Sequence, residues 1–189
     1  MGVLSGPQVH AGPVTSLEEL AGEVAALRAR VEAAEATLAL HDLKARYAAL
    51  VDARYEGGAV VAEDLLAVLA EEIADLFTPD ALWDGGPALG VAEGRAAIVE
   101  RMRAPTLCFS RHLFVSPQLR IAGGRATGRW ELLAPCTTAD GTPHWMAGME
   151  EDEYERGEDG RWRHRRMALT TTFFAPTDTG WRRLATPKK

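Results

Sequence analysis

Asp52 and His112 are the residues of this sequence whose types and surroundings best fit proton-transfer chemistry. The seven-residue spacing that begins at Leu38 passes Ala45 and reaches Asp52, so a carboxylate occupies a position where the pattern expects an apolar side chain. Because burying an unpaired carboxylate is costly, Asp52 must be paired or protonated if this helix face is buried. The alternatives are an exposed aspartate at the end of a helix that bends, or a partner in a C-terminal cap.

His112 lies in the segment CFSRHLFV, an apolar run that is typical of a strand. An imidazole gains and loses a proton near neutral pH, which makes His112 a candidate general base. A core histidine whose ring nitrogens are hydrogen-bonded would give the same pattern. Residue type and position alone therefore leave both interpretations open.

The first element expected to position these residues is a long N-terminal helix. Ser16 and Glu19 have the spacing of a capping box, which marks the helix start after a disordered leader at residues 1–15. Apolar residues then recur in steps of three and four, which predicts an amphipathic helix over residues 16–40 and a partner helix from another subunit or from the same domain. This seam consists of Leu17, Leu20, Val24, Leu27, Val31, Ala34 and Leu38. The helix is expected to continue to the glycine pair at 57–58.

The rest of the chain has helices first and strands afterwards. Helices are predicted over residues 62–77 and 93–103, with a turn at residues 78–80 and a short strand between them. Strands are predicted at residues 108–115, 118–121, 126–136, 144–156 and 161–174. Gly-Gly and Asp-Gly pairs supply the turns of this meander, which indicates an α+β domain with an antiparallel sheet, followed by a loose tail at residues 177–189.

Net charge and cysteine usage exclude several classes of protein. The formal net charge of −6 argues against a nucleic-acid partner, which requires a basic face. Cys108 and Cys136 form no CxxC pair, so neither a disulfide scaffold nor a usual zinc site is expected. There is no signal-peptide pattern and no apolar run of about 20 residues, so we expect a cytoplasmic protein without a membrane partner.

Four short segments of this chain occur in a characteristic order. They are HDLKARYAALVD, ADLFTPDALWDGG with EGRAAIVERM behind it, EEDEYERGEDGRWRHRRM, and TTTFFAP. In this order and spacing they resemble the SnoaL-like group of the nuclear-transport-factor-2-like superfamily, and they define a SnoaL-like domain over residues 37–176. The resemblance implies a cone-shaped, curved sheet wrapped by helices around a pocket, preceded here by an N-terminal helical extension. It also implies a homo-oligomer, usually a dimer or a trimer.

The resemblance implies roles for three residues. In the dehydratases and the lindane dehydrochlorinase of this superfamily, an Asp near the end of the first helix pairs with a His just before the sheet, the places that Asp52 and His112 occupy. Such a carboxylate fixes the imidazole tautomer and stabilises the imidazolium, so that the histidine removes a proton. In the bile-acid dehydratase type a Tyr precedes the Asp by five residues, as Tyr47 does. A packed tyrosine with a satisfied hydroxyl is the alternative.

A second group of residues is expected to bind the substrate. These are Trp83, Phe114, Trp130 and Met149 as apolar walls, with Glu131 and Arg166 as polar contacts. Alternation along a strand lets Glu131 face solvent instead, and it admits only one of Arg165 and Arg166 to a pocket. Lys44 lies on a helix face near that of Asp52, with a solvated side chain as the alternative.

These observations favour a cofactor-free lyase or isomerase, with dehydratase-like acid–base chemistry on a hydrophobic small molecule such as a sterol, terpenoid or polyketide. The sequence has no Gly-rich phosphate loop, GxSxG elbow or HExxH motif, and no metal site is expected. A polyketide cyclase or an epoxide hydrolase is an alternative, although the latter needs a water between carboxylates and a second buried Asp is not evident. A non-catalytic module for small-molecule binding or assembly is the other alternative, because fold alone does not define function.

Overall fold

The structure is a computed structural model, and it describes residues 16–178. The chain divides into two compact units, Met1–Ala36 and Thr37–Lys189. The expected disordered leader at residues 1–15 lies outside the described residues, as does all of the expected tail except its first two positions. No helix of the described part is long and apolar enough to cross a membrane.

Helix α1, Leu17–Asp52, begins where the sequence predicts. The amide of Glu19 donates to Ser16 Oγ at 3.2 Å, which satisfies one of the free amides of the first turn. Side chains of the N-terminal seam are exposed in the single chain, from 39% to 86%, at Leu17, Leu20, Val24, Leu27 and Val31.

The end of α1 differs from the prediction, because the helix stops at Asp52 and does not reach the glycine pair. Gly57 and Gly58, with φ of 60° and 81°, instead form the turn of a small hairpin. The hairpin strands are β1, Tyr55–Glu56, and β2, Ala59–Val60. Asp52 is therefore the last residue of the helix.

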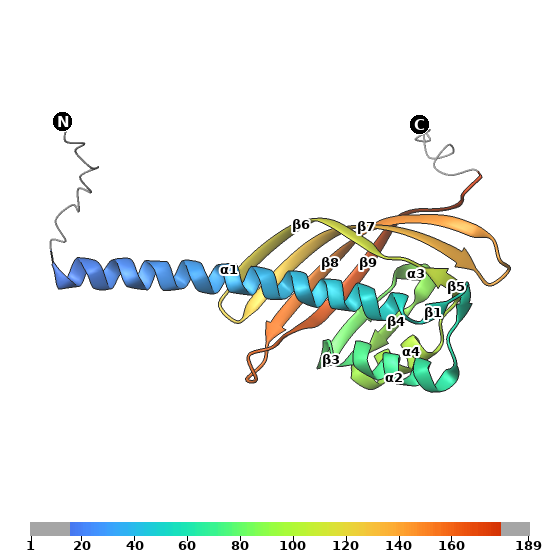
Figure 1. The fold of residues 1–189 in the computed structure, drawn as a ribbon, viewed down its shortest axis with the longest axis horizontal. Coiled ribbons are helices and arrows are strands. Elements are labelled where there is room, and N and C mark those ends of the chain that lie inside the picture. The colour runs from blue at the N-terminus through green and yellow to red at the C-terminus, as the bar shows by residue number, and fades with distance from the viewer. Residues whose placement is uncertain (1–15, 179–189) are drawn as a thin grey trace, which may run out of the picture. The chain divides into compact units, whose positions relative to one another are not determined.

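The second unit is built on a seven-stranded sheet in the order β4-β3-β9-β8-β7-β5, with β6 also pairing with β7. The strands are β3 Phe77–Asp84, β4 Val91–Glu93, β5 Leu107–Ser110, β6 Leu113–Ala122, β7 Arg125–Thr138, β8 Pro143–Arg156 and β9 Trp162–Pro176. The helices are α2 Glu63–Ala74, α3 Gly86–Leu89 and α4 Arg95–Arg103. Figure 1 shows the long strands β7, β8 and β9 curving together, with α2 and α4 side by side near β3. The predicted α+β fold with a curved sheet is confirmed.

The sheet is mixed where the sequence predicted an antiparallel one, because β3 and β9 run parallel while the other neighbouring pairs are antiparallel. β3 comes from the helical half of the chain and enters the sheet beside its last strand. A hairpin cannot join parallel neighbours, so the chain between β3 and β9 has to cross over through helices and the other strands.

β3 also replaces the end of the predicted helix over residues 62–77 and the predicted turn at residues 78–80. Phe77 pairs with His164 of β9, and the side chains of Phe77, Ala81 and Trp83 are buried. The strand register shifts between Phe77 and Leu82, so the Thr-Pro-Asp sequence lies at an irregularity where proline omits no required ladder bond. Burial of this strand overrides the local turn preference.

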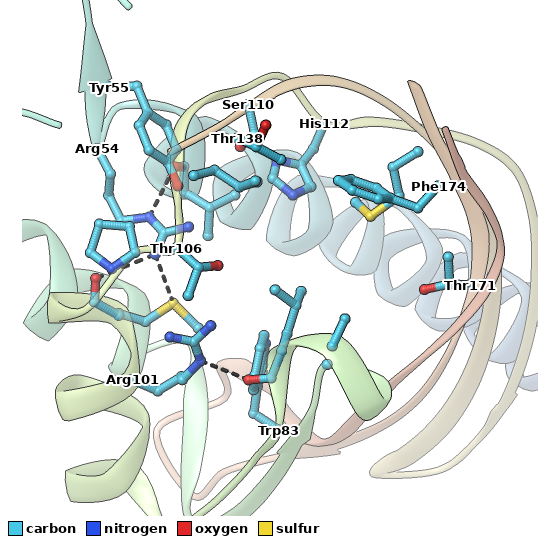
Figure 2. Close-up of a pocket in the computed structure, with 18 of the residues that line it drawn as sticks. Arg54, Tyr55, Trp83, Arg101, Thr106, Ser110, His112, Thr138, Thr171 and Phe174 are labelled. Carbon is cyan, nitrogen blue, oxygen red and sulfur yellow. Dashed lines mark hydrogen bonds between the residues drawn. The ribbon is translucent and has the colours of Figure 1, made fainter. Parts of the chain in front are cut away.

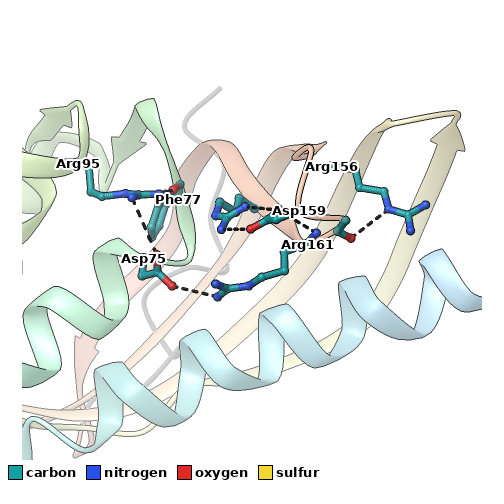
Figure 3. A network of polar contacts seen from close by, with 8 residues as sticks. Asp75, Phe77, Arg95, Arg156, Asp159 and Arg161 are labelled. Carbon is teal, nitrogen blue, oxygen red and sulfur yellow. Dashed lines mark hydrogen bonds and ion pairs between the residues drawn. The ribbon is translucent and has the colours of Figure 1, made fainter.

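Ion pairs hold the end of α2 against the turn that leads into β9 (Figure 3). Asp75 accepts a hydrogen bond from Arg161 Nη2 at 2.9 Å, and Arg95 donates to the main-chain oxygen of Phe77. In the same turn, Asp159 accepts two hydrogen bonds from Arg163. The contact between Asp75 and Arg161 ties the end of α2 to this turn, although an exposed ion pair contributes little to stability.

Candidate active site

Asp52 and His112 are in direct contact, as the sequence and the resemblance predict. Nδ1 of His112 lies 2.7 Å from Oδ1 of Asp52, and the backbone amide of His112 donates to both carboxylate oxygens at 3.1 Å. The side chains are 7% and 14% exposed, respectively. Three contacts from one residue thus hold the carboxylate in a site with little access to water.

A break in the sheet edge brings His112 to this carboxylate. β5 and β6 pair with successive parts of β7, so the strand predicted over residues 108–115 is interrupted between them. Opposite the break lies Pro135 of β7, which accepts a hydrogen bond from the Arg111 amide at 3.0 Å but has no amide hydrogen to return. The freed amide of His112 bonds to Asp52 instead of to the sheet.

The contact with Asp52 favours a role for the His112 imidazole as a proton acceptor. When Nδ1 carries a proton and donates it to Asp52, Nε2 keeps a lone pair that can accept another proton. Arg111 Nε lies 3.7 Å from the second carboxylate oxygen, but this guanidinium is 69% exposed and its pull on Asp52 is screened by water. The His112 ring stacks on Phe114, with ring centroids 6.0 Å apart.

His112 lines a cavity of about 290 Å³ inside the second unit. Figure 2 shows the imidazole ring turned toward the open centre, opposite Trp83 and Arg101. Most of the wall is apolar, from Val51, Ala88, Leu89, Met102, Leu107, Met146 and Phe174. Hydroxyl and guanidinium groups supply the polar part, from Tyr47, Tyr55, Thr106, Ser110, Thr138, Thr171, Arg54 and Arg101.

Tyr47 and Trp83, both predicted at the site, line the same cavity. Nε1 of Trp83 donates to the Tyr47 hydroxyl oxygen at 3.0 Å, so the phenol oxygen is an acceptor in this contact. Burial raises the pKa of Tyr47, and the nearby charge of Glu150 raises it further. The phenol therefore keeps its hydrogen and can donate it to a bound molecule.

Phe114 and Trp130 were predicted from the sequence to line the cavity, but they do not. They lie instead beside the Lys44 ammonium, which is 4.2 Å from the Phe114 ring centroid and 5.8 Å from that of Trp130. Nε1 of Trp130 donates to the Tyr154 hydroxyl at 2.8 Å. Both rings surround a buried charge and not the cavity.

Glu131, Met149 and Arg166 also lie away from the cavity, which corrects their expected place in its wall. Glu131 and Met149 are opposite one another on β7 and β8. The buried residues of β8 are the even-numbered ones, from Met146 to Tyr154, so Met149 faces the other way. Met146 takes the position in the cavity wall that was expected for Met149.

The even-numbered face of β8 carries two carboxylates, and Lys44 neutralises them from α1. Lys44 is 1% exposed, which excludes the solvated alternative, and its ammonium contacts Glu150 and Asp152, the latter at 2.7 Å. Burial alone would lower the pKa of Lys44, but the charges of Glu150 and Asp152 raise it overall. Burial raises the pKa of Glu150. The Tyr154 hydroxyl donates to Asp152 at 2.7 Å.

His164 lies beside this cluster and is fully buried. Burial lowers its pKa to about 3, against a smaller opposite effect of Asp152. It is a neutral core side chain that packs on Phe77, Tyr154 and Tyr47. Within residues 16–178, no group of three or more His, Cys, Asp or Glu side chains is arranged to hold a metal ion.

The cavity wall also contains three residues that the sequence did not indicate, Arg54, Tyr55 and Arg101. Arg54 and Tyr55 follow directly after α1, where a longer helix was predicted, so no pattern marked them. Arg101 was visible as a residue of the predicted helix over 93–103. In the sequence, the one indication that the Arg101 side chain lies at the edge of the core is its place next to Met102, which is buried.

The curled mixed sheet, the covering helices and the cavity define a protein of the nuclear-transport-factor-2-like fold class. The chain belongs to the SnoaL-like domain family, whose model matches residues 32–168. A comparison with curated protein sequences gives no match.

Several solved structures share this fold at low sequence identity. A type 2 hexachlorocyclohexane dehydrochlorinase (LinA) is 18% identical with a TM-score of 0.64, over 78% of this chain and 92% of that chain. A nuclear-transport-factor-2-like protein from Novosphingobium aromaticivorans is 22% identical with a TM-score of 0.57, over 93% and 100%. ActVI-ORFA from Streptomyces coelicolor is 21% identical with a TM-score of 0.56, over 73% and 98%. At these identities the similarity establishes the fold alone.

Proposed function

We propose that this protein is a cofactor-free lyase or isomerase that moves a proton on a hydrophobic small molecule, with His112 as the general base. The main support for this proposal is the distance of 2.7 Å between His112 Nδ1 and Oδ1 of Asp52. The same histidine lines a mostly apolar cavity. The fold similarity to a dehydrochlorinase agrees with this class of chemistry.

In the proposed reaction Nε2 of His112 accepts a proton from a carbon atom of the substrate. The carboxylate of Asp52 holds the ring in the correct tautomer and stabilises the imidazolium that forms. In a lyase, the electron pair left on carbon forms a double bond while the leaving group departs. In an isomerase, the same pair shifts and the proton returns to another carbon. A positioned base contributes about 10²–10⁴-fold to the rate.

Tyr47 is the proposed acid. Its phenol keeps its hydrogen because burial raises its pKa, and it lines the same cavity as His112. A hydrogen bond from this hydroxyl would polarise a substrate carbonyl or assist a departing hydroxyl group. The hydrogen bond from Trp83 fixes the phenol oxygen in place.

The composition of the cavity wall separates the proposal from its alternatives. No Asp or Glu of the described chain lines the cavity, which disfavours an epoxide hydrolase that holds water between two carboxylates. The volume of about 290 Å³ lies just below the usual range for ligand pockets, about 300–1,000 Å³. It favours a small ring system of terpenoid or polyketide type over a complete sterol. A polyketide cyclase uses the same proton transfer, whereas a binding module needs none.

The test is a search for proton transfer to and from carbon. A panel of β-hydroxy ketones and β,γ-unsaturated ketones is incubated with the protein in deuterated water, and loss of water or uptake of deuterium is followed by mass spectrometry. We expect activity that disappears in His112→Ala and persists in His41→Ala, which removes an exposed histidine of α1. Equal activity in both variants would exclude His112 as the base. Binding of a panel compound without any exchange would favour the binding module.

The assembly and location of the protein are further parts of this proposal. We expect a homo-oligomer, since the apolar seam of α1 is exposed in the single chain. The cytoplasmic location expected from the sequence stays a prediction.

A further inference from the structure

Arg54 and Arg101 line the cavity without a carboxylate partner in the part of the chain that the structure describes. Their hydrogen bonds go to main-chain oxygens, apart from one from Arg54 Nη1 to the Met102 sulfur at 3.5 Å. Arg54 donates from Nε to Val51 at 3.0 Å and from Nη1 to Met102 at 3.3 Å. Arg101 donates from Nε to Leu89 at 2.9 Å and from Nη1 to Ala104 at 2.6 Å. These bonds fix both guanidinium groups but do not neutralise them.

The two charges lie near the same group, the phenol of Tyr55. Burial raises the pKa of Tyr55, while the positive charges of Arg54 and Arg101 oppose that rise. The Arg54 guanidinium lies 5.5 Å from the Tyr55 ring centroid. The buried hydroxyl of Ser110 is in electrostatic reach of the phenol but makes no hydrogen bond of normal geometry in the described structure. One end of the cavity is therefore positive and rich in unused donors.

Two like charges at the edge of an apolar cavity repel one another, and an anion between them removes this repulsion. Among the described contacts, no hydrogen bond uses the Nη2 amino group of Arg54 or Arg101. A guanidinium with free N–H groups matches the two oxygens of a carboxylate in geometry and in charge. Figure 2 shows both arginines along one side of the cavity and His112 on another.

We infer that the cavity binds a small amphipathic carboxylic acid, whose carboxylate lies between Arg54 and Arg101 and whose apolar body extends toward His112. This substrate class rests on the proposed function for the chemistry at His112, but the binding itself does not. The small cavity volume favours a carboxylate over a bulky phosphate ester or nucleotide.

The test compares two probes of the same shape, 2-naphthoate and 2-naphthamide, by isothermal titration calorimetry at low salt. We expect the acid to bind about tenfold tighter than the amide or more, because a charged acceptor strengthens each hydrogen bond. Arg54→Met and Arg101→Met should each remove most of this preference, because they weaken binding of the acid more than binding of the amide. Arg103→Met is the matched control, since Arg103 is an exposed arginine of the same helix α4. Added salt should weaken acid binding alone.

Equal affinity for the two probes, or no binding of the acid at millimolar concentration, would overturn the inference. So would an equal loss in Arg103→Met and Arg101→Met. If Arg→Met variants do not fold, Arg54→Lys and Arg101→Lys keep the charge and should retain part of the acid preference. The assay measures binding only, so a missing turnover counts against the proposed function and leaves this inference intact.

Charged side chains flank the apolar seam of α1. In the heptad pattern, Val24 and Val31 occupy a positions, and Leu20 and Leu27 occupy d positions, a combination that favours two parallel strands. The flanking g and e positions carry Glu23 with Arg28, and Arg30 with Glu35. In a parallel pair, each g residue faces the e residue of the following heptad on the other helix.

We also propose that a second copy of this chain covers the seam, as a parallel, in-register coiled coil. Both kinds of cross-pair then have opposite charges, Glu23 with Arg28 of the second copy and Arg30 with Glu35 of the second copy. The exposed apolar side chains of the seam are removed from water at the same time.

Light scattering at micromolar concentration should give a dimer, and deletion of residues 1–36 should give a monomer. Arg28→Glu, which places like charges opposite one another, should weaken the dimer about tenfold, and Glu23→Arg in the same chain should restore it. Oxidation of Leu27→Cys should form a disulfide between copies, since d positions meet in a parallel pair. A monomeric full chain, or a dimer that survives the deletion, would overturn this proposal.

Discussion

Replacing Lys44 with methionine should destabilise the protein strongly, because it leaves two buried carboxylates without their cation. The side chains of Lys44, Glu150 and Asp152 are 1%, 6% and 0% exposed. Breaking a buried ion pair by removing one partner costs about 3–5 kcal/mol, whereas methionine keeps the length and packing of the lysine stem. Asp152 retains its hydrogen bond from Tyr154, so most of this cost falls on Glu150.

The loss should depend on pH in a defined direction. Burial raises the pKa of Glu150 above its ordinary value of 4.5, so the folded state binds more protons than the unfolded state between the two values. Stability therefore falls as pH rises through this window. Without the charge of Lys44 the pKa of Glu150 should rise further, which widens this window and enlarges the total fall. Lys44→Met should therefore lose less stability at pH 5 than at pH 8.

Urea unfolding followed by tryptophan fluorescence measures these differences. Arg46→Met is the matched control, an exposed cation of the same helix, and it should change stability by less than about 0.5 kcal/mol. Adding Glu150→Gln to Lys44→Met should recover about 1–3 kcal/mol, because the amide carries no charge to bury. A loss below about 1 kcal/mol at pH 8, or an equal loss at both pH values, would show that Lys44 does not neutralise buried carboxylates.

Three further predictions concern the site and the sheet. Once a substrate is known, His112→Ala and Asp52→Asn should each lower kcat by about 10²–10⁴-fold. The double variant should lose no more activity than the worse single variant, whereas additive losses would show that the two residues act independently. Tyr47→Phe should lower kcat about tenfold to hundredfold, and an unchanged rate would leave the hydroxyl without a role. Gly148→Ala should destabilise the protein by about 1–3 kcal/mol in thermal unfolding, since the new Cβ would lie 2.7 Å from the main-chain oxygen of Thr170. The control Gly22→Ala has open space around the new Cβ and should stabilise the protein slightly.

The contact between Asp52 and His112 was predictable because two signals agreed. The heptad spacing placed a carboxylate in an apolar register, and the family resemblance placed a histidine opposite it. Tyr47 followed from the same resemblance and Trp83 from its aromatic side chain, and both line the cavity. Residues near the ends of predicted elements were harder to place, since the helix end at Asp52 depends on a hairpin whose strands have only two residues each.

Lys44 and its two carboxylates show why the remaining details could not be predicted. Alternation along β8 would put Glu150 and Asp152 in the core, which looks unfavourable until their cation on α1 is known. A sequence pattern describes each helix or strand separately. The three charged side chains, in contrast, can be buried only together, because each needs an opposite charge beside it. The parallel orientation of β3 was likewise not predictable, because it depends on pairing with β9, a strand near the other end of the domain sequence.

Lys44 and its two carboxylate partners lie far apart in the sequence, which limits the order in which the chain can fold. Lys44 contacts carboxylates that follow 106 and 108 residues later, so a long loop must close before either contact forms. During synthesis the ammonium remains in water until β8 has emerged and paired. A one-residue slip of β8 would turn both carboxylates outward and leave the buried lysine without a partner. The C-terminal half of α1 can therefore dock in its final position only after β8 is in register.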